Sequence, residues 1–340
     1  MKNTPISIVG KIVNPGERST LELPEAAIYN QTSIKIPIQV LHGKEKGPRV
    51  FVVAAIHGDE INGVEIIRRL LKHRLLKKIR GTLILVPVVN IYGFMTLSRY
   101  LPDRRDLNRS FPGSKSGSLA ARLAHLLMTE IISKCTHGID LHTGNIHSEN
   151  LPHVRLNLDV PGALKMARAF NVPVIVNAKL RDGSLRQAAT ELNIPMLVYE
   201  AGEALRFNEL AIRIGLRGVL NVLHALGMLE KPIKQTKIKS KVAHQSSWVR
   251  SPESGILHPL NTLGNDVEEG EKLGIIASPF TKNETEIVAN MAGFVIGKNT
   301  LPLVNEGDAL FHIAKLNEVD EVESDMNNLR HDVASDPDFF

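Results

Sequence analysis

His57 and Glu60 lie in the segment His57-Gly58-Asp59-Glu60, directly after an apolar run at residues 50–56. An imidazole nitrogen and a carboxylate oxygen are both ligands that zinc accepts in proteins. Open α/β sheets place their chemistry where a strand ends and the next helix begins. The pair therefore predicts a metal site at the carboxyl end of a strand.

A third ligand is predicted in Asp140-Leu141-His142-Thr143-Gly144, where an imidazole follows strand-type residues. Hydrolytic zinc sites use three protein ligands and keep one position for water, so His142 would complete the set with one zinc ion per chain. Asp140 would share a face with His142 in a regular strand and help to orient it. The single cysteine, Cys135, excludes a thiolate-rich site and an internal disulfide, so we expect it only to fill space.

A hydrolytic site also needs a general base. Glu200 in Val198-Tyr199-Glu200-Ala201-Gly202 ends another apolar run and is the best candidate, the alternative being an N-cap for the following helix. Residues 99–113 are rich in arginine, whose forked donors bind carboxylates and stabilise a developing oxyanion. A solvated basic loop is the other interpretation of that segment.

These residues need a sheet to position them. Strand-type runs occur at residues 49–56, 82–90, 137–142 and 196–200, and helical apolar spacing occurs at 62–78 and 118–133. Alternating strands and helices predict an α/β fold with a mainly parallel mixed sheet flanked by helices.

The length of 340 residues, together with the changes in residue pattern along the chain, predicts two domains and a C-terminal tail. We expect a catalytic α/β domain at 1–235 and a glycine-punctuated all-β domain at 236–315. Residues 316–340 carry eight acids against one arginine and are expected to bury little and to be mobile in part. The net charge of the remaining chain is therefore more positive than the +5 of the whole chain. This surplus suits either an anionic substrate or a solvated basic surface.

Hydrophobic residues make up 43% of the chain and charged residues 23%, as in ordinary globular proteins. No apolar run approaches the roughly 18 residues of a membrane span, and the first residues do not resemble a signal peptide. We expect a cytoplasmic protein that binds neither membrane nor nucleic acid, and the sequence leaves a homo-oligomer open.

Four ordered motifs resemble the succinylglutamate desuccinylase and aspartoacylase family, a branch of the zinc carboxypeptidase fold, over roughly residues 45–230. They are His57-Gly58-Asp59-Glu60, Asp106-Leu107-Asn108-Arg109, Asp140-Leu141-His142-Thr143-Gly144 and Tyr199-Glu200-Ala201-Gly202. The resemblance implies that His57, Glu60 and His142 bind zinc. It also implies that Glu200 acts as general base and acid.

The same resemblance implies that Asn108 and Arg109 hold a substrate carboxylate and that a further arginine polarises the scissile carbonyl. Arg99 is the preferred candidate for that arginine, with Arg104 and Arg105 as alternatives in the same loop. Arg155, Arg181 and Arg186 are expected in later loops, where Arg155 would contact the acidic end of a substrate. His147 and His153 are interpreted as polar loop residues, because three ligands are already present.

The C-terminal β segment resembles the barrel of lipoyl and biotinyl carrier domains, on Gly255-Ile256-Leu257, Gly293-Phe294-Val295 and Gly307-Asp308-Ala309-Leu310-Phe311. Lys282 stands about where such carriers place their modified lysine, but its neighbours match neither carrier signature. We therefore expect the scaffold without the prosthetic group.

Together these observations predict a zinc-dependent amidohydrolase that removes an acyl group from a small, anionic N-acyl amino acid or related acylated amine. A zinc carboxypeptidase acting on peptides is the first alternative, since the same site cuts either bond. The second is a non-catalytic binding module with a structural metal, although structural zinc usually has four protein ligands.

Overall fold

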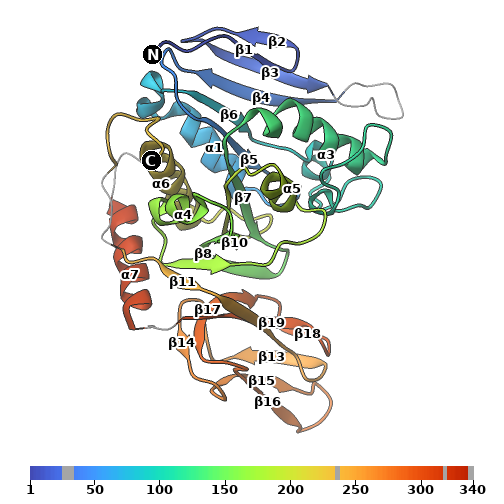
Figure 1. The fold of residues 1–340 in the computed structure, drawn as a ribbon. Helices are drawn as coiled ribbons and strands as arrows, with labels where there is room; N and C mark the ends of the chain where they lie inside the picture. The colour runs from blue at the N-terminus through green and yellow to red at the C-terminus, as the bar shows by residue number, and fades with distance from the viewer. Residues whose placement is uncertain (25–33, 234–237, 317–319, 336–340) are drawn as a thin grey trace.

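The fold of this computed structural model is built on one large mixed sheet, and the structure describes residues 1–24, 34–233, 238–316 and 320–335 (Figure 1). The sheet runs in the order β12-β19-β17-β8-β10-β7-β5-β6-β4-β3. Three further strands lie off this path: β9 pairs with β8, β11 pairs with β9, and β14 pairs with β17. Its N-terminal members are β3 (Arg18–Pro24), β4 (Lys35–His42), β5 (Arg49–Ala54), β6 (Thr82–Val86), β7 (His137–Gly144), β8 (Ser148–Leu156), β9 (Val174–Asn177), β10 (Met196–Glu203) and β11 (Lys241–Ala243). A separate hairpin is made by β1 (Ile6–Ile8) and β2 (Lys11–Val13).

The predicted α/β fold is confirmed, but the parallel part of the sheet is smaller than expected. β6, β5, β7 and β10 pair in parallel, as do β8 with β9 and β9 with β11. β3, β4, β8 and the C-terminal strands join by antiparallel pairing. The sheet is therefore mixed, as predicted, with its parallel strands at the centre.

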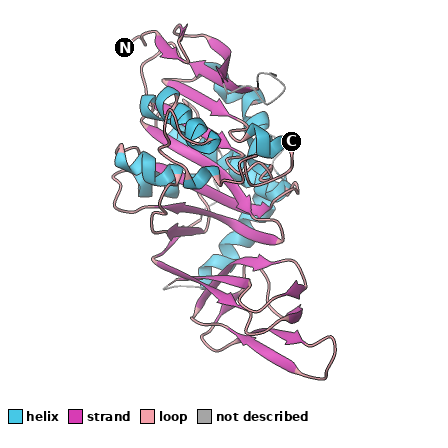
Figure 2. Cartoon of the chain, turned by 90° about the vertical axis from the view of Figure 1, so that its right-hand side faces the viewer, coloured by secondary structure: helices cyan, strands magenta, loops and turns pink. Residues whose placement is uncertain are grey.

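Both faces of the parallel strands are covered (Figure 2). Along β5, Val50 and Val52 belong to one core cluster and Phe51 and Val53 to another, because successive strand side chains point to opposite faces. The first cluster packs beneath α1 (Asn62–Lys72), α4 (Ala163–Phe170) and α6 (Glu209–Ala225), and the second beneath α3 (Leu119–Glu130) and α5 (Leu185–Glu191). The remaining short helix near the site is α2 (Ile91–Met95).

The two long predicted helices each end early and continue as a 3-10 turn. α1 stops at Lys72 because His73 adopts an extended backbone, and η1 (Arg74–Lys78) follows. α3 is followed in the same way by η3 (Ile132–Lys134).

Cys135 is buried nearby, and burial raises the pKa of its thiol to about 12, as fits a packing role. Of the helices described, each is too short or too polar to cross a bilayer.

The C-terminal strands enclose a third core cluster between two sheets. One sheet has the order β16-β15-β13-β18, and strands β12, β19, β17 and β14 face it as the end of the large sheet. Because β17 pairs with β8, with Gly297 opposite Asn150, the C-terminal strands join the sheet that carries the predicted ligands. Their bounds are β12 (Gln245–Arg250), β13 (Gly255–Pro259), β14 (Asp266–Val267), β15 (Lys272–Ala277), β16 (Glu284–Val288), β17 (Gly293–Asn299), β18 (Leu303–Val304) and β19 (Ala309–Lys315).

The acidic tail differs from the expectation that it would bury little. Its described part forms α7 (Asp320–Ser335), which packs against α6. Met326, Leu329 and Val333 are buried in the first core cluster, at the spacing of one helix face. Arg213 of α6 also donates a hydrogen bond to the Val333 carbonyl at 3.2 Å. The many acidic residues of this segment made its apolar helix face difficult to recognise from the sequence.

Replacing Leu329 with alanine is expected to lower the free energy of unfolding by about 2–4 kcal/mol, because it leaves a cavity between α7 and α6. Urea unfolding of the full chain measures the change. Asn328→Ala is the matched control, since Asn328 is exposed on the same helix. Equal unfolding midpoints for the two variants would show that the packing of Leu329 does not stabilise the fold.

Candidate active site

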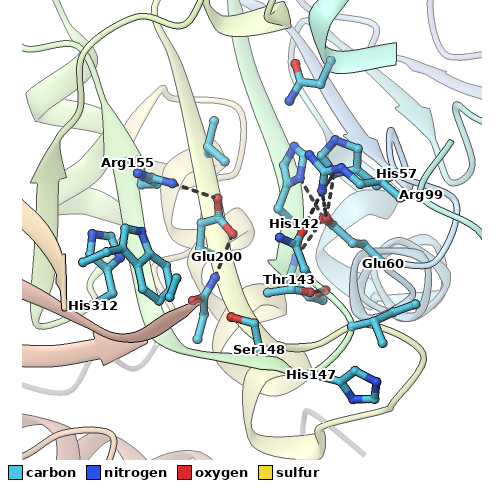
Figure 3. A pocket seen from close by; sticks show the side chains of 18 of the residues that line it. His57, Glu60, Arg99, His142, Thr143, His147, Ser148, Arg155, Glu200 and His312 are labelled. Atoms are coloured by element: carbon cyan, nitrogen blue, oxygen red, sulfur yellow. Dashed lines mark hydrogen bonds and ion pairs between the residues drawn. The ribbon is translucent and has the colours of Figure 1, made fainter. Parts of the chain in front are cut away.

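His57, Glu60 and His142 meet at the carboxyl ends of two neighbouring parallel strands (Figure 3). His57 Nδ1 lies 2.6 Å from Glu60 Oε1, and His142 Nδ1 lies 2.7 Å from Glu60 Oε2. All three side chains are buried, and their ligand atoms lie within 4.8 Å of one another. The structure thus brings together the three predicted ligands and offers a group that could hold a metal ion.

The local backbone explains how β5 delivers two of these side chains. The chain turns after β5, where the Glu60 amide donates to the His57 carbonyl at 3.1 Å, and α1 begins two residues later. Gly58 sits against Gly93, so closely that a Cβ at residue 58 would lie 2.0 Å from the Gly93 carbonyl carbon. Only glycine fits at this position, which lets the turn aim His57 and Glu60 at the same point.

Both imidazoles are held from behind by carboxylates. His142 Nε2 lies 2.8 Å from Asp140 Oδ2, and His57 Nε2 lies 3.2 Å from Asp106 Oδ1. Each ring therefore turns Nδ1 toward Glu60 and Nε2 toward an acid, as metal-binding histidines in proteins usually do. Asp140 was predicted in this position. Asp106 was missed as an individual residue, although its motif was recognised.

The charges fit a cation site. Burial alone would raise the pKa of Glu60, but His57 and His142 hold it well below its usual range, so the side chain is a carboxylate. Two imidazoles and one carboxylate without thiolates are a donor set that zinc accepts. The residues present therefore fit the predicted metal.

Arg99 reaches the same point from the loop after α2. Its Nη1 lies 3.2 Å from His57 Nδ1 and 3.4 Å from Glu60 Oε1, while Asp106 holds its Nη2 at 2.9 Å. Arg104 and Arg105 are absent from the described residues that line the pocket, and Arg105 is exposed beside Asp103. Of the three arginines considered for polarising the carbonyl, the structure brings Arg99 to the ligands.

Glu200 lies one strand away from His142, because β10 pairs with β7 with these two residues in register. Asn150 Nδ2 donates to its Oε2 at 3.1 Å, and Arg155 Nη1 approaches its Oε1 at 3.5 Å. Burial raises the pKa of the Glu200 carboxyl. A buried carboxyl with a raised pKa beside a metal group is a frequent sign of acid–base chemistry.

A pocket of about 650 Å³ contains these groups together with Asn108, Arg109 and Arg155. This volume suits a small molecule. The Asn108 side chain also accepts a hydrogen bond from the Leu185 amide at 2.9 Å, which ties its loop to the start of α5. The predicted substrate-binding residues are therefore assembled around the ligands.

Several positions differ from the sequence-based expectation. Arg155 and His153 lie on β8 and Arg186 on α5, rather than in loops. Arg186 donates to the carbonyls of Ala178 and Lys179 and so holds the backbone as well as lining the pocket. Arg181 also lines the pocket, where burial and the charges of neighbouring arginines lower its pKa.

The C-terminal strands supply one wall of the pocket, which the sequence did not predict. Trp248 of β12 stacks on His312 of β19 with ring centroids 4.6 Å apart, and both line the pocket with Arg250 and Leu303. No local motif marks these residues, because they reach the site through the pairing of β17 with β8.

A mixed sheet that carries a buried His-Glu-His group at its strand ends is an arrangement suited to a metal-dependent hydrolase. Residues 46–226 match the succinylglutamate desuccinylase/aspartoacylase catalytic domain, and the chain belongs to that family.

Relatives cover most of the chain. It is 26% identical over 300 residues to N-alpha-acetyl-L-2,4-diaminobutyric acid deacetylase from Halomonas elongata, covering 84% of this chain and 86% of the relative. A crystal structure of a succinylglutamate desuccinylase/aspartoacylase from Rhodobacter sphaeroides is 27% identical, with a TM-score of 0.80 over 88% of this chain and 96% of that one. The product-bound ectoine utilization protein EutE (DoeB) from Ruegeria pomeroyi shares the fold at 24% identity, with a TM-score of 0.81 over 92% and 99% of the two chains.

Proposed function

We propose that the protein is a zinc-dependent amidohydrolase that removes the acyl group from a small N-acyl amino acid or related acylated amine. The observation that carries the proposal is the buried His57-Glu60-His142 group, which shares one pocket with Glu200 on the adjacent strand. The Halomonas relative, named as a deacetylase of an acetylated diamino acid, supports this class of reaction.

His57, Glu60 and His142 would hold the zinc ion. When bound in a protein, zinc lowers the pKa of a coordinated water molecule and polarises a carbonyl group. Glu200 would take the proton of the attacking water and then pass it to the departing nitrogen. Arg99 would stabilise the negative charge that develops on the carbonyl oxygen. Asp140 and Asp106 keep the two imidazoles in the orientation that this requires.

The cationic wall of the pocket supports an anionic substrate. Arg109, Arg155 and Arg181 line it, and Asn108 stands beside Arg109. We propose that Asn108 and Arg109 hold the substrate carboxylate, since guanidinium groups bind carboxylates through paired donors. Arg155 would contact the part of the substrate that lies near Glu200.

For the C-terminal strands we propose a lipoyl/biotinyl-like barrel that carries no prosthetic group. Two sheets around a third core cluster support the scaffold, and Lys282 falls between β15 and β16. The contribution of Trp248 and His312 to the pocket supports a role in shaping the substrate site instead.

Screening the zinc-loaded protein against N-acetyl, N-succinyl and N-formyl amino acids tests the proposal. We expect hydrolysis of at least one short acyl derivative and no trimming of longer peptides, because the C-terminal strands wall the pocket. Removal of residues from free peptide ends would favour the carboxypeptidase alternative. Purified protein without bound divalent metal and without hydrolysis would favour a binding module.

A further inference from the structure

His153 is a buried histidine in the pocket wall that the proposed reaction does not use. It lies on β8, lines the pocket and is 1% exposed. Its Nδ1 lies 2.7 Å from the Leu151 carbonyl oxygen. Because a carbonyl oxygen can only accept, Nδ1 carries the proton and donates, which leaves Nε2 as an acceptor. Within the described ranges of the chain, this buried Nε2 has no hydrogen-bond partner.

The ring stays neutral under ordinary conditions. Burial, aided by the charge of Arg155, lowers the pKa of His153 to about 3. Nε2 therefore keeps its lone pair at neutral pH. Because this atom has less than 1 Å² of accessible surface, a ligand can reach it only when the surrounding side chains of the pocket wall shift.

Arg155 supplies a matching donor two residues further along β8. Its Nε is also buried and has no partner among the residues that the structure describes, while Nη1 faces Glu200. Alternate residues of a strand share a face, so the His153 acceptor and the Arg155 donor belong to one surface. Buried polar groups are nearly always paired, so two unpaired groups on the same face of one strand point to a ligand or an ordered water.

The position of this surface follows from strand register. His142 of β7 lies opposite Glu200 of β10, and Glu200 lies opposite His153 of β8. Residues directly opposite one another place their side chains on the same face, so the three form a row across the sheet. His153 is on the far side of Glu200 from the predicted ligands. The Trp248–His312 stack lines the same pocket.

We propose that His153 and Arg155 form a polar subsite for an uncharged substrate group that both donates and accepts hydrogen bonds, namely a carboxamide or a hydroxyl. Arg155 Nε donates to the oxygen of that group, and His153 Nε2 accepts its N–H or O–H. The charge of Arg155 disfavours an ammonium group there, and the Nε2 lone pair disfavours a carboxylate. The placement of the substrate rests on the proposed function.

Matched substrate pairs test the subsite. One pair is N-acetyl-L-glutamine and N-acetyl-L-methionine, which differ in the amino acid side chain. The other is the succinamoyl and pentanoyl derivatives of L-alanine, which differ in the acyl chain. In one of the pairs we expect kcat/KM to favour the amide-bearing member by roughly five- to a hundredfold, the effect of leaving buried partners unpaired.

Two variants separate binding from structure. In His153→Asn the amide nitrogen can replace Nδ1 as donor to Leu151, but the acceptor at the Nε2 position is lost, so the preference should disappear. His153→Gln places an acceptor near the Nε2 position and should retain part of the preference. A purely structural role would lower kcat/KM for both members of a pair equally. His244→Asn, at an exposed site between β11 and β12, is the control and should behave as the unmodified protein.

A binding measurement decides the subsite independently of turnover. In the Glu200→Gln protein, the ¹⁵N resonance of His153 Nε2 should shift on adding the amide ligand of the preferred pair and stay unchanged with its apolar partner. Failure of every compound to be hydrolysed would refute the proposed function, whereas this resonance still reports the subsite. Equal use of both members of both pairs, an unchanged preference in His153→Asn, or no Nε2 shift with either amide would overturn the subsite. The subsite would also be overturned if an ordered water molecule stayed between His153 Nε2 and Arg155 Nε while the ligand was bound.

Discussion

The Glu200→Gln variant is expected to lose about 10²- to 10⁴-fold in kcat while keeping its bound zinc. The amide cannot accept the proton of the attacking water and has none to pass to the departing nitrogen. The side chain lies beside the ligand group without belonging to it, so metal binding should not depend on its charge. Steady-state kinetics together with the zinc content per chain measure both parts of the prediction.

Glu191→Gln is the matched control, because Glu191 is an exposed carboxylate at the end of α5 outside the pocket. It should leave kcat and zinc content unchanged. Near-normal turnover in Glu200→Gln would remove Glu200 from the reaction. Loss of zinc together with turnover would instead identify Glu200 as part of the metal site.

Replacing His142 with alanine is expected to abolish both zinc binding and hydrolysis. The change removes one of the three proposed ligands and leaves Glu60 with a single imidazole beside it. A ligand that binds only the folded state stabilises it by about 2.7 kcal/mol at a hundred times its Kd, so loss of zinc should also lower the Tm. Zinc analysis and thermal unfolding, with and without added zinc, give the result.

His137→Ala provides the control from the same strand. His137 stands at the opposite end of β7 and does not line the pocket in the part of the chain that the structure describes. Its replacement should leave one zinc per chain. For the unmodified protein, chelation should abolish activity and added zinc should restore it. Full zinc content in His142→Ala would contradict the assignment of the ligands.

Much of the candidate site could be predicted because its residues follow strand ends. His57, Glu60, His142 and Glu200 each stand near the carboxyl end of an apolar run, and parallel strands bring such ends to one edge of a sheet. The donor types then restrict the chemistry to a metal held by nitrogen and oxygen. The choice of candidate ligands thus depends largely on local features of the sequence.

Residues that reach the site through packing were harder to predict. Asp106 lies 49 positions from His57, and only the folded loop shows that it holds that ring. Arg99 could not be separated from Arg104 and Arg105 by spacing, because the direction of each side chain depends on the path of the loop. His153 was interpreted as a loop residue because the strand pairing of β8 with β10 is not visible in its neighbours.

By itself, the sequence predicted the candidate metal ligands and the candidate base, and it determined the alternation of strands and helices and the family to which the motifs belong. Those features depend on residues close together in the chain, because the spacing of apolar residues and the local backbone preferences decide between strand and helix. Only the tertiary structure decided that the C-terminal strands wall the pocket, that α7 packs on α6, and that His153 Nε2 is buried without a described partner. These outcomes depend on contacts between segments distant in the chain, which form only when the whole core is packed.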